Sequence, residues 1–497
     1  MSKVRIFALG GLDEDGKNML VVEVNDNIFV IEAGLKYPDS ETLGVEFIIP
    51  DFNYLIQNKD RVKGIFITHA HDDVDAALPY LLKQVNAPVY TGGMTSLVIR
   101  EMLRREGVRN AKVHRIKRND VIRINGTKIH TFPMTHAFPD NFGVAIATDQ
   151  GYVVYTGEFI IDYDMMQDEY NCDLNLLSEF GKKGVLALMC ESQGVERNGH
   201  TSPNHRITHL IEPIIESHLD GRILISTYFQ SLFRIQEILD IAIKYRKKIF
   251  IHDDGLLHIL KLMEEMKYYR VPKELLIDRK NFSNDILVII SGQGKNLFRT
   301  MSNIANKEDP FVQFRNTDTI IIASPIVSGT QTDANNMENE IYKEGGTIFT
   351  LDSRQVLSMH PSKEDLKMML YLFKPSYYIP VKGEYRHLYM NATLAMDMGN
   401  ASNHILVLDN GQVAEFENGE VISMAEHLPL SDTMIDGKEN WDVTGVVLKD
   451  REVLSTDGVM IVAVGINART KEIINGPDVQ TRGVIYLKDA EYVVKEA

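Results

Sequence analysis

The first 160 residues alternate between short apolar runs and polar turns. The run at 4–9 and the run at 19–33, which is broken by the turn sequence VNDN, predict three short strands. A helix is expected over 75–85, where Pro79 is tolerated in the first turn, and a second helix over 95–106. Further strands are expected at 62–69, near 121–133, at 143–148 and at 152–156. This pattern predicts a layered α/β domain.

From about residue 205 the pattern changes to a regular alternation of strand and helix. Amphipathic segments at 206–219 and 232–248 alternate with the buried strands RILIST, KIFIHD, ILVIIS and TIIIAS. Such a rhythm is typical of a parallel sheet with helices on both faces. The earlier pattern returns around 355–410, with a helix expected at 363–373. After about 445, the strands GVMIVAVGI and GVIYLK predict the start of a third unit.

Composition agrees with a folded soluble protein of several domains. The chain has 497 residues, 44% of them hydrophobic and 25% charged, which is too long for one core. We expect no membrane span and no signal peptide, and we expect Cys172 and Cys190 to be reduced, partly buried thiols. These features together predict a cytoplasmic location. The net charge of −16 argues against a surface coated with basic patches, but a nuclease with a metal cleft remains compatible with it.

One apparent motif is set aside. GLDEDGKN at 11–18 fits the glycine and lysine spacing of a P-loop, but Asn18 stands where a serine or threonine would bind magnesium. Three acidic residues would face the phosphates, and the following residues predict a strand instead of a helix. We do not expect nucleotide binding here.

A cluster of candidate metal ligands follows the strand at 62–69. His69, His71 and Asp73 lie in one turn, and imidazole and carboxylate suit zinc or manganese. His136 and Glu158 stand at two further strand ends. Each residue alone would be an ordinary polar turn or cap residue. Together they are the arrangement expected when several strand ends line one cleft.

With these motifs in hand, the chain resembles the ribonuclease J family of metallo-β-lactamase and β-CASP nucleases. The resemblance is carried by GGLDEDGKN, FVIEAGL, VKGIFITHAH, TGEF and IPVKGEYRHL. It implies an αββα sandwich interrupted by a β-CASP parallel α/β domain and followed by the start of a small C-terminal α+β domain. The implied ranges are 1–205 and 355–445 for the two parts of the metallo-β-lactamase domain, 206–354 for the β-CASP domain, and 446–497 for the linker and incomplete C-terminal domain.

Members of this family hold two metal ions side by side. The resemblance implies that the first ion is bound by His69, His71, His136 and Glu158. The bridging acid of the family is aspartate, and the glutamate here is one methylene longer. We therefore expect at most one divalent ion, zinc or manganese.

The second ion loses two of its ligands in this sequence. The resemblance implies ligation by Asp73, by the bridging Glu158 and by two histidines, but those histidine positions are Val74 and Lys382. Valine offers no lone pair, and a lysine ammonium has donors only. We expect the second site to be empty and Lys382 to take over its positive charge, pairing with Asp73 or Glu158. A loss of one of two ions is expected to cost roughly 10²–10⁴ in rate.

The RNA-binding loops of the family are also altered. Catalytic roles are implied for Asp73 and His360, and the loop VLSMHPSKED matches the family's backbone-binding loop with Met359 in the place of glycine. ASPIVSG resembles the serine-rich loop for a 5′-phosphate, and plain turn chemistry is the alternative for its serine and for Ser358. The residues implied to bind substrate are Ser324, Val356, Leu357, Ser358, Met359 and His360.

The resemblance implies RNA decay and maturation, mainly 5′→3′ and with endonuclease cleavage as a second mode. We expect a degenerate second paralogue of the kind found beside an active ribonuclease J in Gram-positive bacteria, with weak or partner-dependent hydrolysis. Its expected partners are RNA with a 5′-monophosphate end, the active paralogue, and a second copy of itself. The alternatives are a non-catalytic subunit that stabilises the active enzyme and a competent single-metal nuclease. A small-molecule hydrolase is disfavoured, because it would not need so large an inserted domain.

Overall fold

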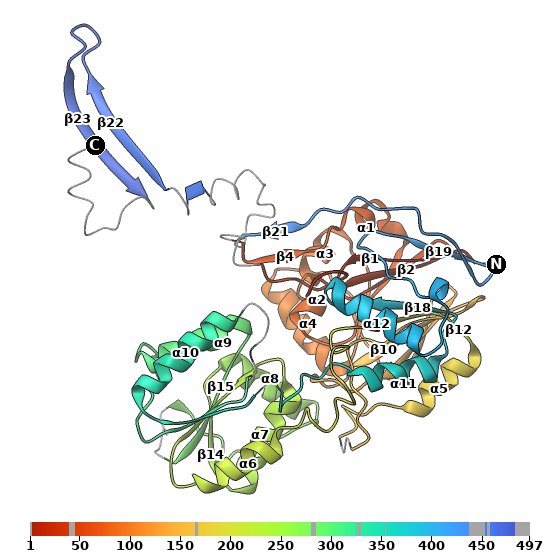
Figure 1. Ribbon diagram of the computed structural model, residues 1–497, viewed down its shortest axis with the longest axis horizontal. Coiled ribbons are helices and arrows are strands. Elements are labelled where there is room, and N and C mark those ends of the chain that lie inside the picture. The colour runs from red at the N-terminus through yellow and green to blue at the C-terminus, as the bar shows by residue number, and fades with distance from the viewer. Residues whose placement is uncertain are drawn as a thin grey trace. The chain divides into compact units, whose positions relative to one another are not determined.

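A computed structural model describes most of the chain. The described residues are 2–38, 45–164, 167–279, 285–324, 326, 330–352, 354–436, 453–454 and 458–482. They form two compact units, one of Met1–Lys36 with Pro50–Ser431 and one of Tyr37–Ile49 with Asp432–Ala497. Figure 1 shows the elements in chain order.

An eight-stranded sheet is the first layer of the large unit, in the order β20-β19-β1-β2-β3-β5-β6-β7. Its strands are β1 (Val4–Gly10), β2 (Met19–Val24), β3 (Asn27–Ile31), β5 (Val62–Ile67), β6 (Val89–Thr91), β7 (Val113–Arg115), β19 (Ala414–Glu417) and β20 (Glu420–Ser423). β3, β5, β6 and β7 run parallel to one another. The strands predicted at 4–9, 19–33 and 62–69 are thereby confirmed.

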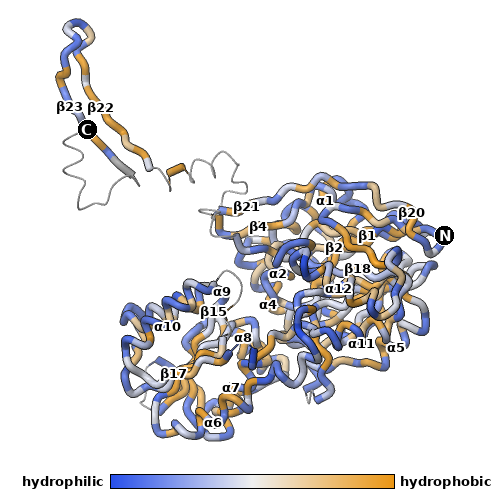
Figure 2. The backbone as a smooth tube through the Cα atoms, in the orientation of Figure 1, coloured by the Kyte–Doolittle hydropathy of each residue, from blue (hydrophilic) through white to orange (hydrophobic). Residues whose placement is uncertain are grey.

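A six-stranded sheet is the second layer, in the order β18-β12-β11-β10-β9-β8. Its strands are β8 (Val121–Ile124), β9 (Thr127–Pro133), β10 (Phe142–Thr148), β11 (Gly151–Tyr155), β12 (Val185–Glu191) and β18 (Tyr377–Val381). Side chains from both sheets form one core between them. A second core lies on the outer face of this sheet, under α5 (Leu174–Lys183), α11 (Lys363–Phe373) and α12 (Tyr385–Asp397). Figure 2 shows the core strands as hydrophobic segments.

Short helices accompany the eight-stranded sheet (Figure 1). They are α1 (Asn53–Gln57), α2 (Asp72–Asp75), α3 (Leu78–Gln84) and α4 (Gly93–Arg105). The helix predicted over 75–85 is α3, but it begins at Leu78, three residues later than predicted, and Asp75 ends the separate helix α2. Pro79 lies in the first turn of α3, where its missing N–H costs nothing, and the Ala77 N–H bonds outside the helix to the Ala33 carbonyl.

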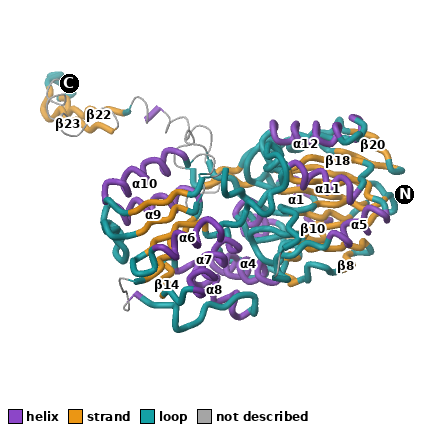
Figure 3. The backbone as a smooth tube through the Cα atoms, turned by 60° about the horizontal axis from the view of Figure 1, so that its bottom comes forward, coloured by secondary structure: helices purple, strands orange, loops and turns teal. Residues whose placement is uncertain are grey.

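The inserted domain is a five-stranded parallel sheet in the order β14-β15-β13-β16-β17. Its strands are β13 (Ile223–Tyr228), β14 (Lys248–Ile251), β15 (Ile286–Gly292), β16 (Thr319–Ile322) and β17 (Thr347–Thr350). One face packs on α6 (Thr208–Ser217), α7 (Leu232–Lys244) and α8 (Asp254–Glu265), and the other on α9 (Gly294–Ala305) and α10 (Gln331–Glu344). Figure 3 shows the helices on the two faces. The parallel sheet predicted here is confirmed.

The small unit contains two antiparallel pairs. β4 (Phe47–Ile49) pairs with β21 (Thr433–Ile435), and β22 (Val459–Ile466) pairs with β23 (Ile473–Arg482). The strand predicted at GVMIVAVGI is β22, whereas GVIYLK lies outside the described residues.

The predicted fold class is confirmed: an αββα sandwich interrupted by a parallel α/β domain. Cys172 and Cys190 are free thiols, partly and fully buried, as predicted. Among the described helices, none has the length and apolarity to cross a bilayer.

Candidate metal centre

Four candidate ligands converge at the carboxyl ends of strands from both sheets of the sandwich. His69 and His71 follow β5, His136 follows β9, and Glu158 follows β11. One ligand atom from each residue lies within 4.8 Å of the others. The sequence-predicted first ligand set is therefore brought together in space.

Backbone carbonyls fix the tautomers of two of these imidazoles. His71 Nε2 lies 3.2 Å from the Gln230 carbonyl oxygen, and His136 Nδ1 lies 2.9 Å from the Met359 carbonyl oxygen. A carbonyl only accepts hydrogen bonds, so each of these nitrogens carries the proton. The opposite nitrogens, His71 Nδ1 and His136 Nε2, keep their lone pairs for the centre, as in histidines that bind metals.

A side-chain relay fixes the third imidazole. The Thr68 hydroxyl donates to Glu32 at 2.7 Å and lies 2.9 Å from His69 Nδ1. Since the hydroxyl proton is used toward Glu32, the oxygen accepts from His69 Nδ1–H. His69 Nε2 is therefore unprotonated and faces the centre.

At this centre, lone pairs of imidazole nitrogens face lone pairs of the Glu158 carboxylate. Burial lowers the pKa of His71 to about 4 and lowers the pKa values of His69 and His136 well below 6.5, so all three rings are neutral. Glu158 Oε2 is 3.1 Å from His136 Nε2 and 3.6 Å from His69 Nε2. Neither of these nitrogens has a hydrogen-bond partner among the described residues. A cation would resolve this contact between acceptors, so the residues present fit one divalent ion.

Lys382 lies directly beside this cluster of three histidines and Glu158. Its ammonium lies 2.6 Å from Asp73 Oδ2 and bonds to Glu158 Oε1, and the residue is 2% exposed. Burial alone would raise the pKa of Asp73, but the charge of Lys382 outweighs it and holds that pKa well below its usual value. Asn18 also donates to Asp73 Oδ2 at 3.0 Å. Asp73 therefore bonds to Lys382 and Asn18 and stands outside the four-residue cluster.

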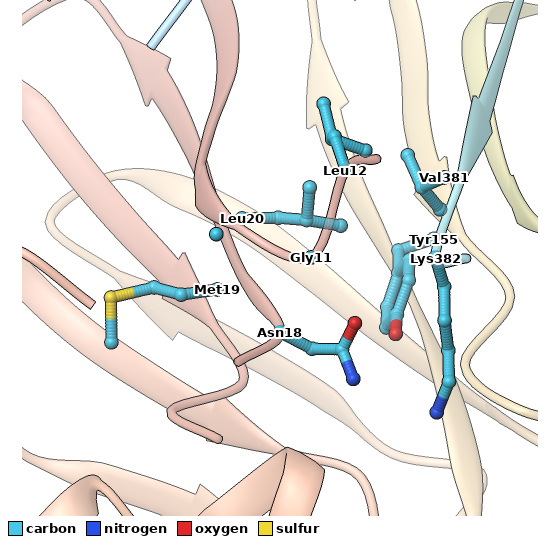
Figure 4. A pocket seen from close by; sticks show the side chains of 9 residues that line it. Gly11, Leu12, Asn18, Met19, Leu20, Tyr155, Val381 and Lys382 are labelled. Atoms are coloured by element: carbon cyan, nitrogen blue, oxygen red, sulfur yellow. The ribbon is translucent and has the colours of Figure 1, made fainter. Parts of the chain in front are cut away.

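Among the described residues, the group of histidine and acidic side chains that could hold an ion is His69, His71, His136 and Glu158. Val74 is 1% exposed and has no lone pair, and both carboxylates that could bind an ion are bonded to Lys382. Figure 4 shows Asn18 and Lys382 directed toward the same side of a small cavity. Its volume of about 10 Å³ is the space of one water molecule.

His360 lies at the edge of the cluster. Its Nδ1 is 2.8 Å from Glu191 Oε2 and 3.8 Å from Glu158 Oε2. Burial raises the pKa of Glu191, and His360 opposes this shift. The Glu191 contact orients the ring, and the residue is partly exposed.

The loop before α11 is divided between exposed and buried residues. Ser358 is exposed and accepts hydrogen bonds from Arg197 through its hydroxyl and its carbonyl oxygen. Met359 is 7% exposed and packs against Ala137 and Ile160.

The first two residues of this loop are held by the inserted domain. Val356 is 1% exposed in the core of that domain, and Leu357 bonds through its backbone to Asn204 and Arg234. Of the five loop residues implied to bind substrate, Leu357, Ser358 and His360 are at least partly exposed, and their role stays a prediction.

Ser324 is separate from the cluster in its contacts. It follows β16, is 3% exposed, and its hydroxyl lies 3.0 Å from the hydroxyl of Ser226 within β13. Most of the remainder of the ASPIVSG loop lies outside the described residues. A phosphate-binding role for Ser324 stays a prediction.

Sequence reasoning missed several residues that organise the centre. Glu191 ends the fully buried strand β12 as an isolated acid, which is the same signal that identified Glu158. Glu32 follows β3 in the same manner. The Gln230 carbonyl gave no sequence signal, because every residue type offers a backbone carbonyl.

Comparisons with known families match two parts of the chain. Residues 220–341 match the model of the ribonuclease J β-CASP domain, and residues 446–497 match that of the ribonuclease J C-terminal domain. The first match lies inside the predicted range 206–354, and the domain boundaries themselves stay predictions.

Relatives match over almost the full length. The chain is 33% identical to ribonuclease J 2 of Staphylococcus epidermidis and 32% identical to ribonuclease J 2 of Staphylococcus aureus, with 99% of this chain and 89% of each relative covered. A crystal structure of a protein of unknown function from Enterococcus faecalis V583 matches with a TM-score of 0.57 and 14% identity. It covers 83% of this chain and 100% of that one, and it supports the fold alone.

Proposed function

The chain belongs to the ribonuclease J family of RNA-processing nucleases, and on that premise we propose that it is a weak, single-metal ribonuclease. The proposal rests on one observation: His69, His71 and His136 direct unprotonated nitrogens at Glu158, while Lys382 is bonded to the carboxylates of the adjacent position. Its substrate is RNA, with a preference for a 5′-monophosphate end. Exonuclease action is the main mode and endonuclease action the second.

The three imidazoles and Glu158 would hold the ion. A divalent ion there supplies Lewis acidity to a phosphoryl oxygen of the substrate. Glu158 uses one oxygen toward the imidazoles and the other toward Lys382. His360, oriented by Glu191, would act as a general acid toward the leaving oxygen when both of its ring nitrogens carry protons.

Lys382 supplies positive charge at the second position without Lewis acidity. Its ammonium pairs with Asp73 and Glu158 and offsets one of their two negative charges, where a second divalent ion would offset both. An ammonium cannot polarise the attacking oxygen as a metal ion does. We therefore expect a rate roughly 10²–10⁴ below that of a two-metal enzyme.

A second candidate function is a non-catalytic subunit that stabilises an active ribonuclease J paralogue in a heteromeric complex. The buried Lys382 favours it, because its bonds to Asp73 and Glu158 occupy the carboxylates that a second ion would need. Self-association as a homodimer is compatible with either function.

The number of metal ions bound per chain distinguishes both candidate functions from a two-metal enzyme. We expect one ion per wild-type chain after dialysis against zinc or manganese, and none in His71→Ala. Combining Val74→His with Lys382→His restores two imidazoles beside Asp73 and is expected to bring the content to two. Two tightly bound ions in the wild type would contradict the proposal.

Decay of 5′-monophosphorylated RNA in manganese separates enzyme from subunit. Wild type and His71→Ala are compared alone and with the active paralogue. Slow decay by the wild type alone, lost in His71→Ala, supports the weak nuclease. If decay appears only with the paralogue, and His71→Ala does not change the decay rate of the complex, the chain acts as a subunit.

A further inference from the structure

One segment of this acidic chain is strongly basic. Residues 100–128 contain ten lysines and arginines and three acidic residues, whereas the whole chain has a net charge of −16. The segment runs from the end of α4 through β7 and β8 into β9. Positive charge concentrated on one part of an acidic protein indicates a surface that attracts a polyanion.

The acidic residues of the segment offset only part of this charge. Their contacts are Glu101 with Arg104 and Arg105, Glu106 with Lys83, and Asp120 with the backbone N–H groups of Lys117 and Val121. Five cations of the segment are exposed and form no ion pair with a described acidic residue. They are Arg109, Lys112, Arg115, Lys117 and Arg123. Exposed cations without a counter-charge are available to bind phosphates.

An exposed ring lies among these cations. His114 belongs to β7, the strand at which the eight-stranded sheet ends within the described residues. Its ring stacks on Tyr90 with the centroids 5.0 Å apart and the planes at 19°, and Tyr90 stacks on Phe66 at 5.2 Å and 18°. Because His114 is exposed at the edge of the sheet, one more flat ring can extend this stack. The bases of single-stranded nucleic acids stack on such rings.

The exposed ring and cations lie close to the candidate metal centre. β5, β6 and β7 are parallel neighbours, so their carboxyl ends meet at one edge of the sheet. His69 and His71 follow β5, and Lys117 follows β7. Two strand spacings separate β5 from β7, a distance of about 10 Å. A nucleic acid strand bound at β7 is therefore within a few nucleotides of the candidate ligands.

We propose that the exposed part of β7 and its flanks bind single-stranded RNA outside the metal centre. The residues of this β7 surface are Lys112, His114, Arg115 and Lys117. One base stacks on His114, and the neighbouring phosphates pair with the three cations. The inference rests on the proposed function, because an RNA substrate is a polyanion with bases between its phosphates. An acidic protein segment supplies the charge without the rings, and so it leaves His114 unused.

The test measures binding of a single-stranded oligoadenylate, labelled at its 3′ end, to the metal-free chain. Fluorescence anisotropy gives the binding constant at several salt concentrations. A triple variant with Lys112→Gln, Arg115→Gln and Lys117→Gln removes three phosphate contacts. We expect weaker binding, and we expect the slope of log K against log salt to become shallower by about 2.

The matched control changes three exposed lysines elsewhere. It combines Lys182→Gln, Lys261→Gln and Lys273→Gln, in α5, in α8 and after α8. Its net charge changes by the same amount as that of the triple variant. Binding to the β7 surface predicts that the control keeps the wild-type slope.

The ring is tested separately. His114→Ala should weaken oligoadenylate binding roughly tenfold, whereas His114→Phe, which retains a ring, should bind like the wild type. An abasic strand of the same length keeps the phosphates without the bases. It should bind the wild type more weakly than oligoadenylate and should not distinguish the wild type from His114→Ala. Polyglutamate of equal charge is the probe for an acidic protein partner and should bind more weakly than oligoadenylate.

Any one of four results would overturn the inference. They are equal slopes for the triple variant and its control, no loss of binding in His114→Ala, equal binding of the abasic strand and oligoadenylate to the wild type, and polyglutamate binding as tight as that of oligoadenylate. The last two need only the wild type, so a folding defect in a variant leaves the inference testable. Because no RNA is cut and no metal is present, an absent nuclease activity would defeat the proposed function without affecting these results.

Discussion

At the scale of the residue, the candidate centre depends on the three imidazoles and equally on the groups that fix their tautomers. Sequence spacing identified His69, His71, His136 and Glu158, and the structure brings them together. Sequence spacing could not identify the Gln230 and Met359 carbonyls, because they come from distant parts of the chain. Nor could it identify the role of the adjacent Thr68 hydroxyl, because that role depends on a bond to Glu32. Lys382 was identified as the residue at the lost position, and its two ion pairs became visible only in three dimensions.

The first prediction concerns Thr68. Thr68→Val keeps the shape of this 0% exposed side chain but removes the hydroxyl between Glu32 and His69. We expect metal affinity to fall roughly 10- to 100-fold, measured by competition with a chelating dye.

Thr95 provides the matched control for that change. It is equally buried, and its hydroxyl has no partner within the described residues. Thr95→Val should leave metal affinity unchanged. An equal loss in both variants would show that the relay does not orient His69.

The second prediction concerns pH. Burial raises the pKa of Glu32 to about 8 from an ordinary 4.5, so between these values the folded chain binds a proton that the unfolded chain has released. This group therefore lowers the free energy of unfolding as pH rises, by about 1.4 kcal/mol per pH unit across that window. Glu32→Gln removes this contribution.

Urea unfolding in a chelator between pH 5 and 8 measures the difference. The free energy of unfolding of Glu32→Gln, minus that of the wild type, should increase with pH. Glu265→Gln, at the exposed end of α8, makes the same chemical change and should give a constant difference. If the difference in free energy of unfolding between Glu32→Gln and the wild type does not change with pH, the raised pKa is contradicted.

At the scale of the element, apolar periodicity predicted the strands well and the helix boundaries unevenly. The helix expected at 363–373 is α11 with those bounds, because Ser362 begins it with a capping box. The helix expected at 75–85 begins only at Leu78, because the Ala77 N–H bonds to the Ala33 carbonyl outside the helix. Such a bond leaves no mark in a local pattern.

The third prediction tests this cap. Ser362 is 0% exposed, caps α11 and bonds to Thr201 at 2.8 Å. Ser362→Ala should lower the free energy of unfolding by about 1–2 kcal/mol, measured in urea. Ser231 is the N-cap of α7 without a side-chain cap bond, so Ser231→Ala should change it by less than about 0.5 kcal/mol. Equal effects would argue against the cap.

At the scale of the whole molecule, the candidate ligands join the two sheets of the sandwich. His69 and His71 follow a strand of the eight-stranded sheet, and His136 and Glu158 follow strands of the six-stranded sheet. The strand and helix rhythm predicted two kinds of sheet, but their pairing order depends on long-range contacts that no local pattern contains.

The fourth prediction follows from this connection. An ion that binds only the folded chain should stabilise it, by about 2.7 kcal/mol at a hundred times its dissociation constant. Thermal unfolding with and without manganese measures the shift. His71→Ala should lose most of it, whereas Thr95→Val should keep it. An equal shift in His71→Ala would place the ion elsewhere.

The hydrogen bond between His136 and the Met359 carbonyl joins residues 223 positions apart in the chain. The whole inserted domain is translated between them. On the ribosome, the first part of the sandwich therefore emerges with its histidines but without the carbonyl that fixes the tautomer of His136. Lys382 emerges later still. The centre is thus assembled last during synthesis, so a nascent chain interrupted before the end of the inserted domain carries the ligand residues without a finished metal site.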